Sequence, residues 1–303
     1  VGIVMNESEI TEDRKQRILK EMHICPVGGH NGVIRTYERL KLYVYWKNMF
    51  QDVEKYIKNC VVCAKIKGNE KSTPFLETDT PPRAWDKISL DLVGPLVKSS
   101  KGNQYLLTCQ DLLTKYIIAA PLERITVEEV TQQLMKHVIL KYGIPIDILT
   151  DHGSQFMNAS FKELAKLLRV KHVHCSAYHP QSNGSLERSH KTLVDYLRAF
   201  CENKFDQWDE WIDFATFTYN TNPHSGTKFT PFELMYGRIV NLPGILQQRK
   251  QPLYNYDNYV KVLKCQMQEN WELARERLVQ KKQEIVGKSK EKYREREFNV
   301  GGM

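Results

Sequence analysis

The sequence predicts an α/β fold, in which helices pack on a mixed β-sheet, with a small helical metal-binding region before it. Two observations lead to this prediction. Between residues 85 and 193, short stretches of alternating polarity are interspersed with helical patterns, as in domains where helices cover a sheet. Before them, two histidines and a Cys-x2-Cys pair lie in a segment too short for a large apolar core. We expect a linker at 65–84, which is rich in Lys, Thr and Pro.

The composition narrows the class of partner. The chain has 303 residues, 41% hydrophobic and 26% charged, which is enough for two or three domains. Its net charge of +8 and pI near 9.0 favour a polyanion, nucleic acid first, although a merely basic protein would look the same. We find no apolar run that would span a membrane and no secretory signal. Scattered cysteines are typical of a reducing compartment. Because the chain starts without Met and ends in FNVGGM, we expect a fragment or a processed product.

The helical region, residues 1–64, contains a candidate zinc site. Its candidate ligands are His23, His30, Cys60 and Cys63. Two imidazoles and two thiolates suit tetrahedral Zn²⁺, and soft sulfur favours zinc over magnesium. A lone Cys-x2-Cys would equally be a redox pair, but the two histidines favour a metal. Cys25 is an alternative thiolate ligand. Helical patterns at 11–22, 32–42 and 51–59 would surround the site.

The first part of the sheet contains two aspartates. We expect strands at 87–96, 105–109 and 115–121, followed by a helix at 126–142. Asp91 lies within the first strand, where a buried carboxylate is costly unless a partner neutralises it. A cation shared with other acids would be such a partner. Asp111 is a rival carboxylate, but we interpret it as a turn or hydrogen-bonding residue, because turns often contain Asp.

The stretch 146–193 predicts a strand–helix–strand unit followed by another helix. We expect a strand ending at Asp151, a helix from Asn158 to about 168, a strand at 170–176, a loop at 178–184 and a helix whose first turn contains Glu187. The first helix should bury Phe161, Leu164, Ala165, Leu167 and Leu168. In a right-handed β-α-β unit the chain returns to the same sheet edge, which brings Asp151 and Glu187 together. Because two converging carboxylates repel, we expect a bound divalent cation.

Beyond this unit the pattern is helical. Helices are expected at 187–203, 207–221, 231–236 and 258–292, with a loop at 241–252. We interpret Trp208 and Trp211 as core residues rather than as a platform for stacking bases. The last helix is highly charged, with opposite charges at i,i+4 spacing. A solvated linker helix is favoured slightly over an arm to another domain or a self-association element.

Asp91, Asp151 and Glu187 together form the candidate catalytic site. Each alone would pass as a surface charge, and Glu187 would be favoured by the helix dipole in any case. A set of three from a strand, a strand end and a helix start is harder to account for in that way. Such carboxylates hold two Mg²⁺ or Mn²⁺ ions, about 3.5–4 Å apart, in enzymes that break and join phosphodiesters.

These motifs resemble those of retroviral-type integrases, especially those of gypsy-like long-terminal-repeat retrotransposons. The resemblance rests on the HHCC zinc ligands, WDKISLDLVGPL with Asp91, ILTDHGSQF with Asp151, and YHPQSNGSLERSHKTL with Glu187. The spacing of the last two acids matches the D,D-35-E signature of that family. TPFELMYGR, at 230–238, resembles a further family segment, and the likeness covers nearly all of 20–240.

The resemblance implies an RNase H-like catalytic core at 85–240, with two Mg²⁺ or Mn²⁺ ions, and one structural Zn²⁺ at 1–64. In the family, water first trims the 3′ end of the element DNA, and the freed 3′-hydroxyl then attacks target DNA. The implied partners are double-stranded DNA and further copies of the chain, in the nucleus, with neither a membrane nor a small-molecule substrate. Residues 241–303 would lead towards a C-terminal barrel that is absent or truncated here.

Two alternatives stay open at this point. The first is a domesticated DNA- or protein-binding module that kept the fold and lost the reaction, against which the intact set of acids argues. The second is an RNase H-type nuclease acting on hybrids, which the zinc region and the loop at 178–184 fit poorly.

Candidate DNA contacts lie on both sides of the last acid. Arg188 and Lys191 follow it on one helix, where Lys191 would reach a phosphate or base, or simply form an i,i+4 pair. The loop before it carries His179 and Asn183, close to the expected substrate. His152 and His179 could donate to phosphate, and a catalytic base is unnecessary if metal ions activate the nucleophile.

Overall fold

A five-stranded mixed sheet forms the centre of the larger domain. The computed structural model describes residues 11–66, 80–151, 153–174, 184–201, 205–242 and 256–292. The strands are β1 (Lys87–Val93), β2 (Tyr105–Asp111), β3 (Ile117–Leu122), β4 (Asp147–Thr150) and β5 (Lys171–His174). They lie in the order β3-β2-β1-β4-β5, with β1, β2 and β3 antiparallel and β4 and β5 parallel to β1. The predicted mixed sheet is confirmed.

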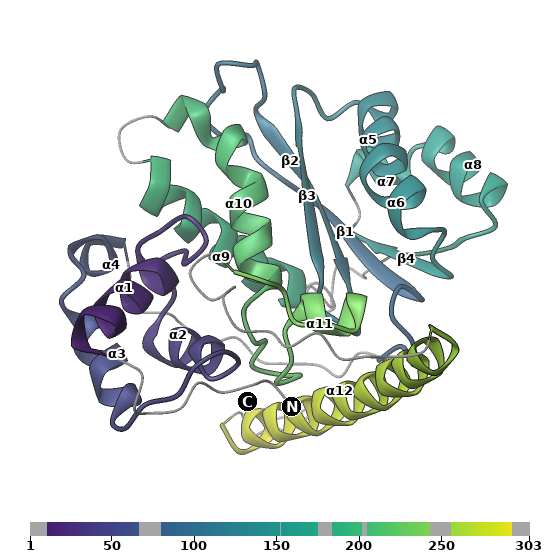
Figure 1. Ribbon diagram of the computed structural model, residues 1–303. Coiled ribbons are helices and arrows are strands. Elements are labelled where there is room, and N and C mark those ends of the chain that lie inside the picture. Colours follow the sequence, from purple (N-terminus) through teal and green to yellow (C-terminus); the bar gives the residue numbers. More distant parts are fainter. Residues whose placement is uncertain are drawn as a thin grey trace, which may run out of the picture.

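Helices cover both faces of this sheet (Figure 1). They are α5 (Val127–Leu134), a π-helical turn (Met135–Ile139), α6 (Leu140–Tyr142), α7 (Ser154–Met157), α8 (Ala159–Leu167), α9 (Gly184–Cys201), a 3-10 turn (Phe205–Gln207) and α10 (Trp208–Asn220). Successive strand residues point to opposite faces. Leu107 therefore packs in one apolar cluster with residues of α5 and α8, and Leu106 in another with residues of α9 and α10. Trp208 is buried in the second cluster, where we expected it.

The helix starts follow the predicted caps. The Thr126 hydroxyl accepts a hydrogen bond from the Glu129 N–H at the start of α5. Asn158 caps α8 in the same way, through the Ser160 N–H. The helix expected at 126–142 is interrupted by its π-helical turn and ends at Gly143, whose φ of 91° favours glycine.

Two expectations for the stretch after Asp151 need correction. Leu167, which we predicted on the inner face of the helix, is 80% exposed, because the buried face of α8 is narrow and centred on Phe161 and Ala165. The short helix α7 was not predicted. It places Phe156 fully inside the core, edge-on to Phe161.

The N-terminal region is helical, as predicted. Its helices are α1 (Glu12–His23), α2 (Val33–Leu40), α3 (Met49–Lys58) and α4 (Val61–Ile66). Leu19, Leu40, Trp46 and Val53 are buried in its small apolar core, which Val240 and Leu242 from the far end of the larger domain complete. We did not predict α4, which is six residues long.

Two further helices lie after α10. They are α11 (Pro231–Tyr236) and α12 (Tyr256–Lys292). The Trp271 indole N–H of α12 donates to the Leu234 carbonyl of α11 at 2.6 Å, and Ala274 and Leu278 are buried. The interpretation of α12 as a solvated linker is therefore wrong for this side of the helix, because it packs on the domain. Within the described part of the chain, no helix combines the length and the apolar character needed to cross a membrane.

Candidate metal centres and catalytic site

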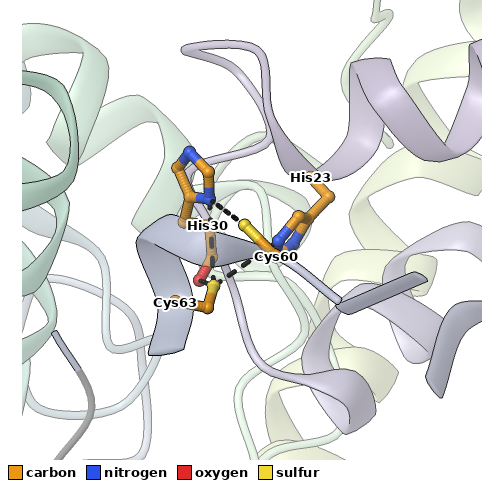
Figure 2. Close-up of side chains that lie close together, drawn as sticks. All are labelled: His23, His30, Cys60 and Cys63. Atoms are coloured by element: carbon orange, nitrogen blue, oxygen red, sulfur yellow. Dashed lines mark hydrogen bonds between the residues drawn. The ribbon is translucent and has the colours of Figure 1, made fainter. Parts of the chain in front are cut away.

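Four side chains of the N-terminal region converge on one point (Figure 2). His23 is the last residue of α1, His30 follows in the next loop, Cys60 precedes α4, and Cys63 lies in its first turn. Their ligand atoms all lie within 4.8 Å of one another. At Gly28 a Cβ atom would lie 2.5 Å from the His23 backbone nitrogen, so the close approach of this loop to α1 requires glycine.

The separations between these atoms fit a tetrahedral zinc ion. The Cys60 sulfur lies 3.4 Å from His30 Nδ1, and the Cys63 sulfur lies 3.5 Å from His23 Nε2 and 3.8 Å from His30 Nδ1. Tetrahedral Zn²⁺, with Zn–S of about 2.3 Å and Zn–N of about 2.0 Å, puts sulfur and nitrogen about 3.5 Å apart. These three separations fit a shared ion, and His23, His30, Cys60 and Cys63 are the residues that would hold it. Cys25, the alternative ligand, is not a member of this cluster.

The loop between the two histidines, residues 23–30, is the zinc knuckle, and it packs on the larger domain. The Pro26 carbonyl accepts hydrogen bonds from the hydroxyls of Tyr196 on α9, at 2.7 Å, and Thr218 on α10, at 3.0 Å. Arg39 of α2 is fully buried and donates to the Val27 carbonyl at 2.6 Å and to the Thr221 hydroxyl at 2.7 Å. Burial lowers the pKa of Arg39 to about 10, which leaves it charged at neutral pH.

Two of the predicted acids belong to neighbouring parallel strands, Asp91 within β1 and Asp151 directly after β4. β1 and β4 pair in a register that sets Ser89 opposite Leu149. Asp91 and Asp151 each follow two residues later along these strands. Continuing the register therefore sets the two aspartates opposite each other. Both side chains are partly exposed, so a divalent cation can reach them.

Groups from three elements contact Asp91, through its carboxylate or its backbone carbonyl. Its Oδ1 accepts from the Leu92 N–H at 2.8 Å, and its Oδ2 lies 3.8 Å from Nδ1 of His190 on α9. The Thr108 hydroxyl on β2 donates to the Asp91 carbonyl at 3.1 Å and lies 2.7 Å from Nε2 of His190. Burial lowers the pKa of His190 to about 4, so the ring is neutral at pH 7 and its contact with Asp91 is not an ion pair.

Asp151 has a similar set of neighbours. Its Oδ1 accepts from the Gly153 N–H at 3.0 Å. The Thr150 hydroxyl donates to the Asp151 carbonyl at 3.0 Å and lies 2.8 Å from Nε2 of His172 on β5. Burial, and then the neighbouring His174, lower the pKa of His172 to about 4, which keeps that ring neutral as well.

The other predicted site residues are only partly described. Glu187 lies in α9, as expected, but its side chain is outside the described residues. His152, His179 and Asn183 also lie outside them, so their proposed DNA contacts stay predictions. Arg188 and Lys191 are exposed on α9.

Asp111, the rival carboxylate, has a structural role. It is fully buried at the end of β2 and accepts hydrogen bonds from the N–H groups of Trp85 and Thr114 and from the Thr114 hydroxyl. Burial raises the pKa of Asp111, while these donors act in the opposite direction. The interpretation as a hydrogen-bonding residue is therefore confirmed.

Sequence reasoning missed the threonines and histidines beneath the two aspartates. Thr108 faces Asp91 across the β1–β2 hairpin, and His172 and His174 share one face of β5. Strand alternation would place two such histidines on one face, but nothing local assigns their partners. His190 follows the last acid by three residues, close to one helical turn.

The two domains match two families of known proteins. An integrase zinc binding domain model matches residues 10–69, and an integrase core domain model matches residues 81–180. Together they span just over half of the chain. The first match contains the His/Cys cluster, and the second contains the five strands of the mixed sheet. The chain therefore belongs to the integrase family, with a zinc-binding domain followed by an integrase core domain.

Its similarity to retrotransposon proteins extends over most of its length. The retrovirus-related Pol polyprotein from transposon 412 of Drosophila melanogaster is 34% identical over 286 residues, which are 93% of this chain and 23% of that protein. The gypsy retrotransposon integrase-like protein 1 of Homo sapiens is 27% identical over 237 residues, 77% of this chain and 44% of that protein. The chain thus spans less than half the length of these relatives. Among solved structures, the catalytic core domain of BIV integrase has 20% identity and a TM-score of 0.42, covering 50% of this chain and 95% of that one.

Proposed function

We propose that the chain is an active integrase, which trims the 3′ ends of retroelement DNA and joins them to target DNA. Asp91, Asp151 and Glu187 are the proposed catalytic carboxylates, and they would hold two Mg²⁺ or Mn²⁺ ions. When bound, such ions supply activation of the attacking oxygen and stabilisation of the leaving oxygen. Carboxylate oxygens brought together on two neighbouring strands would suit these hard cations.

The observation that supports this proposal most is the placement of Asp91 and Asp151 next to α9. Extended by two residues beyond its last pair, the β1–β4 register would set the two aspartates opposite each other, and Nδ1 of His190 on α9 lies 3.8 Å from Oδ2 of Asp91. Residue 187 precedes His190 on the same helix by close to one turn. The backbone of the third proposed ligand thus lies on the stretch of α9 that passes Asp91.

DNA is the proposed substrate, and a group of cations beside α9 supports it. Arg35 of α2 and His224, before α11, line a small cavity, and Arg35 donates to the Thr192 hydroxyl of α9 at 3.3 Å. We call Arg35, Arg188 and Lys228 around His224 the basic cleft. All three are exposed, and among the ion pairs of the described residues none involves them.

The electrostatics of the basic cleft favour an anion. Burial, and then the charges of Lys115, Arg35, Arg188 and Lys228, lower the pKa of His224 to about 3. Burial, Lys282 and Arg188, opposed by Asp111, lower the pKa of Lys115 to about 7. Cations that repel one another in this way are stabilised when a phosphate binds between them. The cleft adjoins α9 and would extend a DNA path from the carboxylates to the zinc-binding domain.

The test is a joining reaction with purified zinc-loaded chain. Short DNA duplexes with varied ends are incubated with supercoiled plasmid in Mg²⁺ or Mn²⁺, and trimmed and joined products are separated by electrophoresis. We expect metal-dependent joining that Glu187→Gln abolishes, with duplex binding retained. Undiminished joining by that variant would refute the assignment. A wild-type chain that binds duplex but neither trims nor joins would favour the domesticated alternative, and preferential cleavage of RNA–DNA hybrids would favour the RNase H-type alternative.

Assembly and location complete the proposal. A reaction that joins two DNA ends to one target needs at least two active sites, so we propose that the chain acts as a homo-multimer, and in the nucleus, where target DNA lies. Light scattering of the chain with and without duplex ends tests the first point. Imaging of a tagged chain tests the second.

A further inference from the structure

The same arrangement of three groups occurs under both proposed catalytic aspartates. A threonine hydroxyl donates to the aspartate's own carbonyl oxygen, at 3.1 Å for Thr108 and Asp91 and at 3.0 Å for Thr150 and Asp151. The same hydroxyl contacts a histidine Nε2, at 2.7 Å for His190 and at 2.8 Å for His172. The four side chains come from four different elements or their ends.

The proton of each hydroxyl fixes the direction of these bonds. A carbonyl oxygen only accepts, so each threonine donates its single proton to the aspartate carbonyl. The histidine Nε2 must then carry the hydrogen and donate to the threonine oxygen, which assigns the tautomer of both rings. Both threonines are fully buried, so no water can replace either bond. Each histidine therefore orients a hydroxyl, and each hydroxyl orients the main chain of an aspartate.

The arrangement joins the two aspartates to different parts of the fold. Thr108 lies directly opposite Asp91 in the β1–β2 hairpin, and its histidine comes from α9. Thr150 is the last residue of β4, and its histidine comes from β5, the neighbouring parallel strand. The main chain at each aspartate is thus restrained from outside its own strand. A carboxylate pair that shares metal ions needs this restraint, because a displacement of about 1 Å is enough to spoil such a site.

We propose that Thr108 with His190, and Thr150 with His172, are positioning residues that set Asp91 and Asp151 at the separation required to bind divalent metal ions. This inference rests on the proposed function, because it takes the two aspartates as metal ligands. Neither threonine needs to touch a metal ion or DNA. A purely structural role would instead satisfy buried polar groups without any effect on metal affinity.

Isosteric substitutions separate these two roles. Thr108→Val and Thr150→Val keep the side-chain volume and remove the hydroxyl, whereas Thr108→Ser and Thr150→Ser keep the hydroxyl. Thr227→Val is the matched control, because the Thr227 hydroxyl is also fully buried and donates to a backbone carbonyl, that of Phe229, at 3.2 Å. His172→Leu adds a variant that leaves both threonines in place and removes only the donor behind Thr150.

The affinity for Mn²⁺ distinguishes the two roles, because a purely structural role of the threonines would leave it unchanged. Mn²⁺ is titrated into zinc-loaded protein by calorimetry, after zinc content and circular dichroism confirm that each variant is folded. We expect both valine variants and His172→Leu to bind Mn²⁺ about 10–100-fold more weakly, the loss typical of outer-shell partners of metal ligands. The serine variants and Thr227→Val should stay within about threefold of the wild type, since they keep both bonded hydroxyls. The Mg²⁺ concentration for half-maximal joining should rise in the same order.

Each outcome has a definite meaning. Equal Mn²⁺ affinity in the folded valine variants and the wild type would overturn the inference. If a valine variant does not fold, His172→Leu alone decides, because it acts on Asp151 only through Thr150. Weakened Mn²⁺ binding in the variants of a chain that never joins DNA would retain the inference and reject the proposed activity. A zinc-loaded wild type that binds no Mn²⁺ and joins no DNA would reject both.

Discussion

The Pro26 carbonyl of the zinc knuckle accepts two hydrogen bonds from the integrase core domain. The Pro26 carbonyl accepts from Tyr196 at 2.7 Å and from Thr218 at 3.0 Å, and both hydroxyl-bearing side chains are 3% exposed. Tyr196→Phe and Thr218→Val each remove one donor with little change of shape. Because a carbonyl oxygen has two lone pairs, the remaining hydroxyl still satisfies it in either single variant.

The structure predicts that the two substitutions are not additive. Each single variant should lose about 1 kcal/mol of unfolding free energy, the usual net value of one hydrogen bond. The double variant leaves the carbonyl without either donor, which adds a desolvation cost of about 1–3 kcal/mol. We therefore expect a loss of about 3–5 kcal/mol for the double variant, and a coupling energy of at least about 1 kcal/mol between the two sites.

Urea unfolding in excess zinc measures this coupling. Tryptophan fluorescence and far-ultraviolet circular dichroism are followed together, and the cycle is evaluated only where the two transitions coincide. Thr218 also lies 3.4 Å from the Val27 carbonyl, and the valine substitution removes that weaker contact in both arms of the cycle. Losses that add to within about 0.5 kcal/mol, the scatter of independent sites, would refute the shared carbonyl.

Three further predictions concern charge, pH and metal. Arg35→Gln and Lys228→Gln should each weaken duplex binding and lower the magnitude of the slope of log affinity against log salt by about one. Lys166→Gln, on the exposed side of α8, should change neither quantity. Equal slopes for the wild type and the Arg35 and Lys228 variants would exclude the basic cleft from the DNA path. Neutral His224 accepts a hydrogen bond from the Gly226 N–H at 3.2 Å, and the pKa of His224 is lowered to about 3. The contribution of His224 to folding stability is therefore complete above about pH 6.5 and declines as the pH falls towards 3. His224→Asn keeps an acceptor and should flatten that decline in urea-unfolding midpoints; an unchanged pH profile would contradict the shift. Cys63→Ser should reduce bound zinc from one per chain towards zero in plasma emission spectrometry, and full zinc content would reject its role as a ligand.

The candidate zinc ligands and the two aspartates of β1 and β4 could be picked out from the sequence for physical reasons. Two imidazoles and two thiolates in a short segment with little apolar core are typical of a structural zinc site, and the structure brings these four side chains into one cluster. The handedness of a β-α-β unit likewise fixes which sheet edge Asp151 reaches. Both arguments rest on rules that a short stretch of chain obeys alone.

Other features depend on contacts that no local pattern encodes. Thr108 and His190 are 82 residues apart, and Tyr196 and Pro26 are 170 apart. The short helix α4 is held in place around Cys63 rather than by its own propensity, because six residues are too few for a helix to be stable alone. The exposure of Leu167 shows the reverse case, in which an apolar residue at helical spacing finds no neighbour to cover it.

The pairing of Thr108 with Asp91 has a consequence for how this chain tolerates insertions and deletions. Side chains alternate along a strand, so one extra residue within β2 would set a neighbour of Thr108 opposite Asp91 and turn the hydroxyl to the other face. The connection at 94–104 is under no such restriction. We therefore expect related chains to differ in length between β1 and β2, while the seven residues of β2 keep a fixed count. In an alignment of such chains, the stretch without gaps would mark the strand that carries the hydroxyl.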